Sequence, residues 1–394
     1  MRNRLYGLAV AALLACVASW ATRVDAAPSG APYVINVIAP MTGSGAFLGK
    51  DYKEAFDALE IAINRSGGIA GRPVKFQLAD SQTSGQVGLQ LANAFIAKHA
   101  QVFIDGGPST VCNATVPVVQ DTGPVDYCLS PVIRPKSGSY IFSAGMPSAD
   151  QAKITLRFLK AKGLTKIGEL SSTDSTGADL EKQVDTALSS SEFKGIDVVV
   201  RDHFNPTDIG VSAQIAHIKS ASPQVVLIWG TGTPFGTALR GASDGGIEVP
   251  IVSTNSNMTY SQMDTFKAYL PRDLWFPALL AMTPEATDKG PLHDAQAAYY
   301  RSFKAVGVTP DEGHILAWDP AMIIVSALRK LGPDANAQQI RDDILHLHGY
   351  IGVDGVYDFS NSDQRGITDK SGAMARWDAL KRRWVRISRP GGYL

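Results

Sequence analysis

Strand-like and helix-like stretches alternate along most of this chain, and that alternation restricts its fold more than any other feature. Short apolar runs such as YVINVIA (33–39) and VKFQLAD (74–80) are followed by amphipathic stretches, and a second series runs from KIGEL (166–170) to VPIVS (249–253). Apolar strands that alternate with helices form parallel sheets covered on both faces. The sequence therefore predicts an α/β fold with doubly wound parallel sheets.

The alternation breaks near residues 140–148, where YIFSAGMPS separates the first series of strands from the second. A chain of 394 residues is also longer than a typical single domain. After residue 270 the order changes again, with helices expected at 290–306, 313–331 and 337–347 and hairpin-like strands at the end. Two lobes are therefore expected.

Small polar loops follow several of the candidate strands, namely MTGSG, GGPST, SPVIRP, SSTDSTG, GTGTPFG and STNSN. In open α/β sheets, ligands bind beyond the carboxyl ends of the strands. Backbone N–H groups and hydroxyls gathered there suit a small polar or anionic ligand. The loops predict a cleft between the two lobes.

The first 26 residues have the pattern of a secretory signal peptide. A basic start, Met1 to Arg4, precedes the apolar run LAVAALLACVASWA, and small residues around Asp25 place the cleavage after Ala26. Alternatively, LLAC is a lipoprotein cleavage box and Cys16 becomes a lipid anchor. In either case the chain is expected to be exported to the periplasm.

Cys112 and Cys128 are expected to form a disulfide, because they are the two cysteines left after cleavage and the compartment is oxidising. One lies at the start of a helical stretch and the other at the end of the next strand, and such ends are neighbours in an α/β unit. Two buried free thiols are the alternative.

The charge is balanced, with 37 Lys plus Arg and 37 Asp plus Glu, and the charged residues form no basic stripe. This composition argues against nucleic acid or an anionic membrane surface as the main partner.

A glycine-rich turn at Gly43, Gly45 and Gly49 nearly matches the dinucleotide fingerprint, but its last gap is one residue too long. Asp80, which ends the second strand, also lies further along than the fingerprint requires. We expect no cofactor, and interpret the turn as facing another kind of ligand.

No familiar catalytic motif stands in the sequence: it has no G-x-S-x-G, H-E-x-x-H or G-K-[ST]. His346 and His348 lie in a stretch expected to be helical, where residues two apart do not share a face. We therefore expect no metal site and no enzyme activity, and binding is the leading class of function.

The segment IAPMTGSGAFLGKDYKEAFDALEIAINRSGGIAGRPVKFQLADSQTS resembles the start of the periplasmic leucine/isoleucine/valine-binding protein family. The resemblance implies the type I solute-binding fold, with two α/β lobes joined by three crossover strands. It places one lobe at 32–146 plus 282–371 and the other at 147–281 plus 372–394. It also implies a monomer that closes on a small molecule and delivers it to the permease of an ABC transporter.

By position, the family's ligand contacts fall on the polar loops named above. The resemblance assigns the ligand side chain to Phe47 or Leu48 and the ligand carboxylate to four residues of the first lobe. The remaining contacts belong to the second lobe. The complete set is Phe47, Leu48, Ser109, Thr110, Val132, Arg134, Thr176, Thr231, Thr233, Asn255 and Asn257.

The departures from the family pattern concern the charge of the ligand. Where the family places an acid for the ammonium of an amino acid, this chain has Asn255 to Asn257. An unpaired ammonium in a closed cleft costs several kcal/mol, whereas Arg134 suits a carboxylate. We therefore favour an aromatic or short aliphatic acid, with a branched-chain amino acid next. Candidates for an apolar wall are Phe47, Trp229, Phe235 and Tyr260.

Two other classes of function remain open from the sequence. A ligand-sensing subunit of a receptor or regulator has the same fold, and an exported α/β enzyme of unfamiliar type is the third reading. Neighbouring permease genes would favour transport, and turnover of a bound ligand would favour an enzyme.

Overall fold

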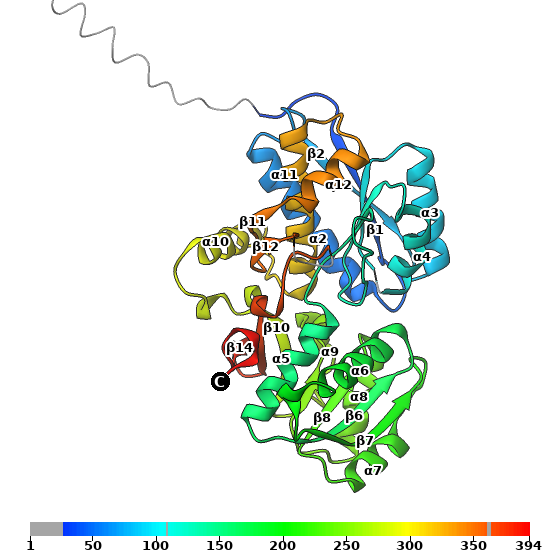
Figure 1. The fold of residues 1–394 in the computed structure, drawn as a ribbon, viewed down its shortest axis with the longest axis vertical. Coiled ribbons are helices and arrows are strands. Elements are labelled where there is room, and N and C mark those ends of the chain that lie inside the picture. The colour runs from blue at the N-terminus through cyan, green and yellow to red at the C-terminus, as the bar shows by residue number, and fades with distance from the viewer. Residues whose placement is uncertain (1–26, 108, 361–363) are drawn as a thin grey trace, which may run out of the picture.

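The computed structural model describes residues 27–107, 109–360 and 364–394, which form two α/β lobes stacked along the long axis (Figure 1). The predicted signal peptide, with its cleavage site and Cys16, lies outside these residues. Among the residues that are described, no helix is long and apolar enough to cross a membrane.

The first sheet has five parallel strands in the order β2-β1-β3-β4-β5. Their bounds are Tyr33–Ala39 (β1), Val74–Asp80 (β2), Val102–Asp105 (β3), Val125–Cys128 (β4) and Ile141–Ser143 (β5). The end of β1 lies beside the end of β2, and β3 and β4 end together. The carboxyl ends of these strands therefore share one edge of the sheet.

Helices cover both faces of this sheet. On one face lie α3 and α4, which pack on each other, and on the other lie α2 and α11, with α12 beside them. The bounds are Ala46–Arg65 (α2), Gly85–Ala97 (α3), Ser109–Val119 (α4), Pro291–Lys304 (α10), Glu312–Leu331 (α11) and Ala337–Leu345 (α12). In β1, Ile38 packs in the α3–α4 layer, while Val37 and Ala39 pack in the α2 layer. This alternation explains why the strand is apolar from Val37 to Ala39.

The second sheet has seven strands in the order β14-β13-β10-β9-β8-β6-β7. The five from β10 to β7 in this order are parallel, whereas β13 is antiparallel to β10 and β14 to β13. The strands span Lys166–Ser172 (β6), Asp197–Phe204 (β7), Val225–Trp229 (β8), Ile251–Ser253 (β9), Leu274–Leu279 (β10), Gly372–Asp378 (β13) and Arg383–Arg386 (β14). Its helices are Ser148–Ala161 (α5), Ser175–Leu188 (α6), Ser212–Ser220 (α7), Thr233–Asp244 (α8) and Tyr260–Thr265 (α9).

The chain passes between the lobes in three places: from β5 to α5, from β10 to α10, and from the small β11–β12 hairpin (His348–Ile351 and Val356–Asp358) to β13. The predicted architecture of two doubly wound α/β lobes is confirmed, with an antiparallel edge on the second sheet. The exact lobe boundaries remain a prediction, and each falls within one of these three connections.

Two local expectations were wrong. His348 opens strand β11 rather than lying in a helix, because α12 ends at Leu345 and His346 is its C-cap. The stretches GGPST, SSTDSTG and GTGTPFG are not entirely loops, since α4, α6 and α8 begin within them at Ser109, Ser175 and Thr233. In the last stretch Gly232 and Pro234 have low helix propensity, yet proline is well tolerated in a helix's first turn.

Candidate ligand-binding cleft

A cavity of about 470 Å³ lies between the carboxyl edges of the two sheets. Loops of both lobes and the first turns of α2, α4, α6 and α8 line it, together with Leu316 of α11. The lining residues are Ser44, Gly45, Phe47, Leu48, Thr83, Gly107, Ser109, Thr110, Leu129, Ser130, Pro131, Val132, Asp174, Ser175, Thr176, Pro206, Thr207, Thr231, Thr233, Pro234, Ser256 and Leu316. These loops follow β1, β2, β3 and β4 in the first lobe and β6, β7, β8 and β9 in the second. The cleft therefore lies where an open α/β sheet places its ligands.

Eight of the eleven residues predicted to bind the ligand lie on the wall of this cavity. They are Phe47, Leu48, Ser109, Thr110, Val132, Thr176, Thr231 and Thr233. Arg134, Asn255 and Asn257 do not line it. The placement brings the sequence-predicted loops together, while the binding role of each residue stays a prediction.

Arg134 faces Asp179 of α6 instead of the cavity. The guanidinium makes a two-pronged ion pair with that carboxylate, at 2.7 Å for Nη1 to Oδ1 and 3.0 Å for Nη2 to Oδ2. Ser148 Oγ donates to the same carboxylate at 2.5 Å. Since Arg134 belongs to the first lobe and Asp179 to the second, the pair joins the lobes and occupies both terminal nitrogens of the guanidinium.

Asn255 and Asn257 point away from the cavity because the chain turns through a 3-10 helix at residues 255–257. The Nδ2 of Asn255 donates to Oε1 of buried Glu312 at 2.6 Å, and Oδ1 of Asn257 accepts from the N–H of Gly232 at 3.1 Å. Burial, followed by the charge of Asp311, raises the pKa of Glu312 well above its usual value. Ser256, between the two asparagines, is the residue that reaches the cleft.

Three of the aromatic residues expected to form an apolar wall lie elsewhere. Trp229 is buried and donates its Nε1–H to Glu169 at 2.7 Å, and Phe235 packs against Phe266 in the core. Tyr260 packs against Trp384 at 4.7 Å between ring centroids. Phe47 does line the cleft. The other apolar lining residues are Leu48, Leu129, Pro131, Val132, Pro206, Pro234 and Leu316. Of these, the sequence predicted only Leu48 and Val132 as ligand contacts.

Four helices begin at the cleft. The first N–H groups of a helix have no partner within the helix and carry its positive end. The N-caps of α2 and α8 are Gly45 and Gly232, neither of which offers a capping side chain, and α4 presents Ser109 and Thr110 from its first turn. In α6, by contrast, the carboxylate of Asp174 accepts from the first N–H groups. The positive ends of three helices thus face the cavity without a carboxylate cap in the residues described.

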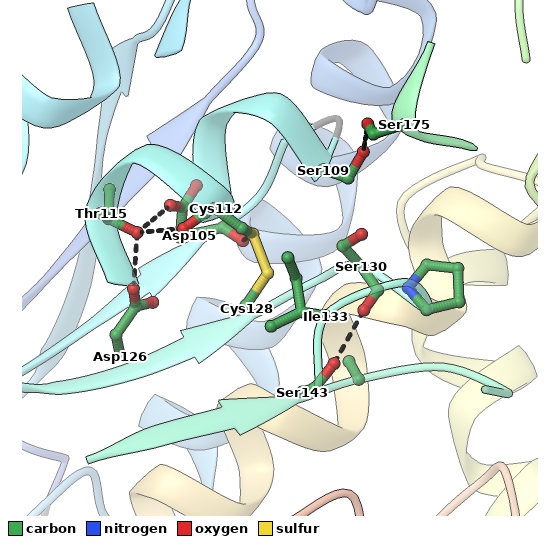
Figure 2. The surroundings of a disulfide bond; sticks show 12 residues. Asp105, Ser109, Cys112, Thr115, Asp126, Cys128, Ser130, Ile133, Ser143 and Ser175 are labelled. Carbon is green, nitrogen blue, oxygen red and sulfur yellow. Dashed lines mark hydrogen bonds between the residues drawn. A yellow bond between two sulfur atoms is a disulfide. The ribbon is translucent and has the colours of Figure 1, made fainter. Parts of the chain in front are cut away.

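The two lobes touch across the cleft. Ser109 Oγ of α4 and Ser175 Oγ of α6 are hydrogen-bonded to each other (Figure 2). On the other side of the cleft Gly232 approaches Phe47 so closely that a Cβ on the glycine would lie 2.9 Å from Cε1 of the ring. The structure therefore represents a closed arrangement of the lobes.

The predicted disulfide between Cys112 and Cys128 is confirmed, with the two Cα atoms 6.1 Å apart. It ties the first turn of α4 to the end of β4 (Figure 2). Both the Ser109–Thr110 turn and the 129–132 loop of the cleft wall adjoin this link. The disulfide therefore fixes two cleft loops relative to each other.

With this fold and cleft in view, the comparisons with known proteins decide the family. The pattern of the periplasmic binding protein family matches residues 32–381. The chain belongs to this family. The resemblance seen in the sequence is thus confirmed, and the family is one of binding proteins; the absence of enzyme activity remains a prediction.

Relatives within the family are distant in sequence. The chain is 25% identical over 244 residues to Leu/Ile/Val-binding protein homolog 3 of Brucella melitensis, a match that covers 61% of this chain and 66% of that relative, just under two thirds of its length. Solved structures include the leucine-binding protein LivK of Thermotoga maritima, with a TM-score of 0.78, 17% identity and coverage of 91% of this chain and 99% of that one. A solute-binding protein of Rhodopseudomonas palustris in complex with benzoate has a TM-score of 0.74, 14% identity and coverage of 91% and 96%. These structures confirm the type I fold.

Proposed function

We propose that this chain is an extracytoplasmic solute-binding protein that delivers a small carboxylate without an amino group to an ABC importer. The observation that carries the proposal is the set of polar groups on the cleft wall, which favours a negative over a positive charge. Helix N-termini and hydroxyls face it, and its one lining acid is already engaged.

The anion of the ligand is matched by backbone rather than by a side-chain cation. A carboxylate beside the first turns of α2, α4 or α8 accepts hydrogen bonds from N–H groups and gains from the positive helix ends. Ser109, Thr110 and Thr233 add hydroxyl donors from two of these turns. Arg134 is not needed for this role, and its ion pair with Asp179 supports closure instead.

An ammonium group would meet a single carboxylate in the same cleft, that of Asp174, which already caps the start of α6. Asp174 is the one acid among the lining residues, and its Oδ1 accepts from the N–H groups of Thr176 and Gly177 at 3.0 Å each. Burying a cation without a counter-charge costs several kcal/mol. This argument disfavours amino acids even though relatives carry Leu/Ile/Val-binding names.

The body of the ligand is expected to be apolar and compact. Phe47, Leu129, Val132 and Leu316 offer an aromatic and aliphatic surface in a cavity of about 470 Å³, a size that suits a small organic molecule. Aromatic acids of the benzoate or cinnamate type and short branched acids both fit this description.

Binding would be coupled to hinge closure. A ligand that contacts both lobes favours the closed form, and the contacts Ser109–Ser175 and Arg134–Asp179 form in that form. The closed protein, acting as a monomer, would then present its two lobes to the permease without altering the solute.

Pairs of ligands that differ by one amino group test the proposal directly. We would titrate residues 27–394 calorimetrically with 4-methylpentanoate and leucine, then with 3-phenylpropanoate and phenylalanine, and finally with benzoate. We expect the acid of each pair to bind more tightly by about 100-fold or more, equivalent to about 2.7 kcal/mol. Tighter binding of the amino acids would overturn the ligand assignment, and loss of uptake on deletion of the gene tests the transport role.

A further inference from the structure

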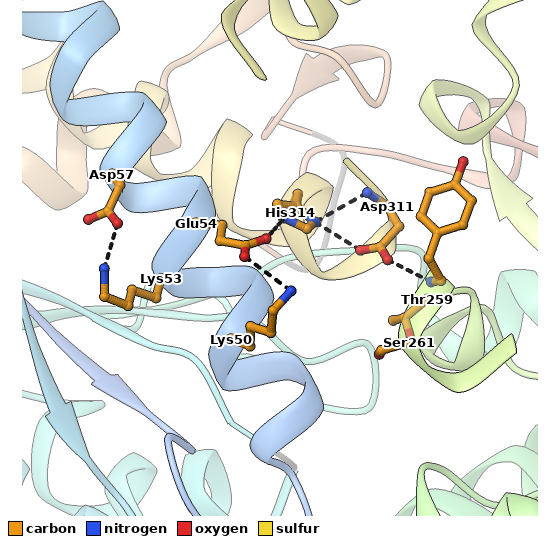
Figure 3. A network of polar contacts seen from close by, with 9 residues as sticks. Lys50, Lys53, Glu54, Asp57, Thr259, Ser261, Asp311 and His314 are labelled. Atoms are coloured by element: carbon orange, nitrogen blue, oxygen red, sulfur yellow. Dashed lines mark hydrogen bonds and ion pairs between the residues drawn. The ribbon is translucent and has the colours of Figure 1, made fainter. Parts of the chain in front are cut away.

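A second hollow of about 400 Å³ lies beside the junction of the lobes and shares no lining residue with the cleft. Its wall is rich in ionisable groups and includes Lys50, Asp51, Glu54, Asp311 and His314. Figure 3 shows the network, with α2 on one side and the start of α11 on the other.

Three potential metal ligands meet in this hollow. Asp51 and Glu54 are three residues apart in α2 and therefore share a helix face, while His314 comes from the first turn of α11. One carboxylate oxygen of each acid and one ring nitrogen of His314 lie within 4.8 Å of one another. His314 Nε2 and Glu54 Oε2 are 3.2 Å apart, a spacing that two ligands can keep while each lies about 2.0–2.2 Å from one ion.

Asp311 orients the imidazole for this role. Its Oδ1 lies 2.8 Å and its backbone N 3.2 Å from His314 Nδ1, so Asp311 holds the ring in place and Nε2 faces Glu54. A carboxylate behind the remote nitrogen of a ligating histidine is the usual arrangement in metal sites, where it sets the tautomer and strengthens the ligand.

Asp51 is an independent sign of a missing partner. The residue is 3% exposed, and its Oδ2 has no hydrogen-bond partner among the described residues. Gly313 leaves the space for this side chain, since a Cβ there would lie 2.6 Å from Cβ of Asp51 and 2.8 Å from Oδ2. Burying an unsatisfied carboxyl oxygen is costly unless something pairs with it.

We propose that Asp51, Glu54 and His314 form a site for a divalent cation of the zinc type. One imidazole nitrogen and two carboxylates suit zinc, whereas magnesium and calcium prefer oxygen ligands alone. The hollow leaves a fourth position for water. The sequence suggested no metal site because Glu54 and His314 are separated by 260 residues.

A bound cation would join α2 to α11 and reach the second lobe through Asp311. Asp311 Oδ2 accepts from the N–H of Tyr260, the first residue of α9, at 2.8 Å. Lys50 Nζ lies 3.0 Å from Glu54 Oε1, so its ammonium competes with the cation for this carboxylate.

Calorimetric titration of chelator-treated residues 27–394 with zinc chloride tests the site. We expect one ion per chain, at least about 100-fold weaker binding in Asp51→Asn, and about 10- to 100-fold weaker binding in Asp311→Asn. Lys50→Met should bind several-fold more tightly. Asp57→Asn, which removes a carboxylate one turn further along α2 that pairs with Lys53, serves as the matched control.

Two results separate a metal site from a merely structural cluster. Without metal, Asp51→Asn should keep or raise the melting temperature, because it removes an unpaired buried carboxyl, yet it should lose the rise that zinc gives the wild type. Equal zinc binding by Asp51→Asn, Asp57→Asn and wild type would overturn the proposal, as would the absence of stoichiometric binding.

Discussion

The cleft and the second hollow beside the lobe junction, here called the junction hollow, are similar in volume, at about 470 and 400 Å³, but their walls differ in the number of charged side chains. The cleft is lined by hydroxyls and apolar groups together with the carboxylate of Asp174, and helix N-termini supply its positive potential. The junction hollow gathers Asp51, Glu54, Asp311 and His314 into one network. The backbone dipoles at the cleft are fixed by the fold, so no charged side chain has to be desolvated to provide the positive potential. The charged side chains at the lobe junction, by contrast, must be paired with groups of opposite charge.

In the junction hollow, the charges of the acidic side chains are compensated mainly by His314. Burial alone would lower its pKa, but the hydrogen bonds to Asp311 and Glu54 raise the pKa to about 9. The hydrogen bond from His314 is also the main reason that the pKa of Glu54 falls to about 2. Burial, together with the charge of Asp311, raises the pKa of Asp51 to about 8.

Removing the imidazole is expected to have the largest effect on stability. His314→Ala leaves buried Asp311 without its cation and removes one of the two cations beside Glu54, and breaking a buried pair costs about 3–5 kcal/mol. The free energy of unfolding, measured by guanidinium denaturation in chelator, should fall by that amount. The exposed Lys53–Asp57 pair on the same helix is the control: its removal should cost under about 0.5 kcal/mol.

The pH dependence of stability should follow the same residue. A histidine with a folded pKa of about 9 and an unfolded value near 6.5 stabilises fully below about pH 6.5, and this contribution is lost as the pH rises through 9. The loss should amount to roughly 3 kcal/mol. Asp51 acts in the same direction, because the folded chain keeps its proton up to about pH 8 while the unfolded chain has released it.

Denaturation of the metal-free protein at pH 6 and pH 9, with His314→Ala alongside, isolates this contribution. Ligand affinity should stay nearly constant over the same range, since the cleft relies on hydroxyls and backbone groups. An equal pH dependence of stability in the variant and the wild type would contradict the charged network around His314. A ligand affinity that changes between pH 6 and pH 9 would show that an ionisable group also contributes to binding in the cleft.

A carboxylate placed in the cleft should reverse its selectivity. In Ser256→Asp the new charge faces an anionic ligand, and at an effective dielectric constant of 20 such repulsion reaches about 4 kcal/mol at 4 Å. We expect binding of 4-methylpentanoate to weaken by about 100-fold, or about 2.7 kcal/mol, while leucine binding improves. Ser190→Asp, at an exposed position outside the cleft, should change neither. Unchanged acid binding in Ser256→Asp would place the ligand's anion elsewhere.

Much of the fold could be predicted from the sequence because parallel strands are short, apolar and periodic. The expected strands at 33–39 and 74–80 match β1 and β2 residue for residue. The loops after the strands also converge as expected, since the sheet itself brings them together. The pairing of Cys112 with Cys128 followed from the same geometry.

The orientation of individual side chains within those loops could not be predicted. The 3-10 turn at 255–257 directs both asparagines into the protein and Ser256 toward the cleft. Hydrogen bonds to Glu312 and Gly232 hold the asparagines in this orientation. Arg134 was assigned to the ligand because no sequence pattern reveals its partner Asp179, 45 positions away. The cluster of Asp51, Glu54 and His314 could not be predicted for the same reason, because these residues come together only when α2 and α11 pack against each other.

Closure itself can be weakened by one methyl group, although the effect should be the smallest of these. Gly232 has φ +71° and ψ −128°, a combination that L residues rarely adopt, so Gly232→Ala costs about 1–3 kcal/mol in the second lobe whether the cleft is open or closed. The added Cβ meets Phe47 of the first lobe at 2.9 Å and therefore penalises the closed form alone. Gly246→Ala is the control, because it also places an alanine at a positive φ, +67°, and its Cβ meets Nζ of Lys219 within its own lobe. Both variants should lose stability, but we expect Gly232→Ala alone to bind the ligand about tenfold more weakly, or by about 1.4 kcal/mol. Equal affinities in the two variants would mean that the lobes do not close at Phe47.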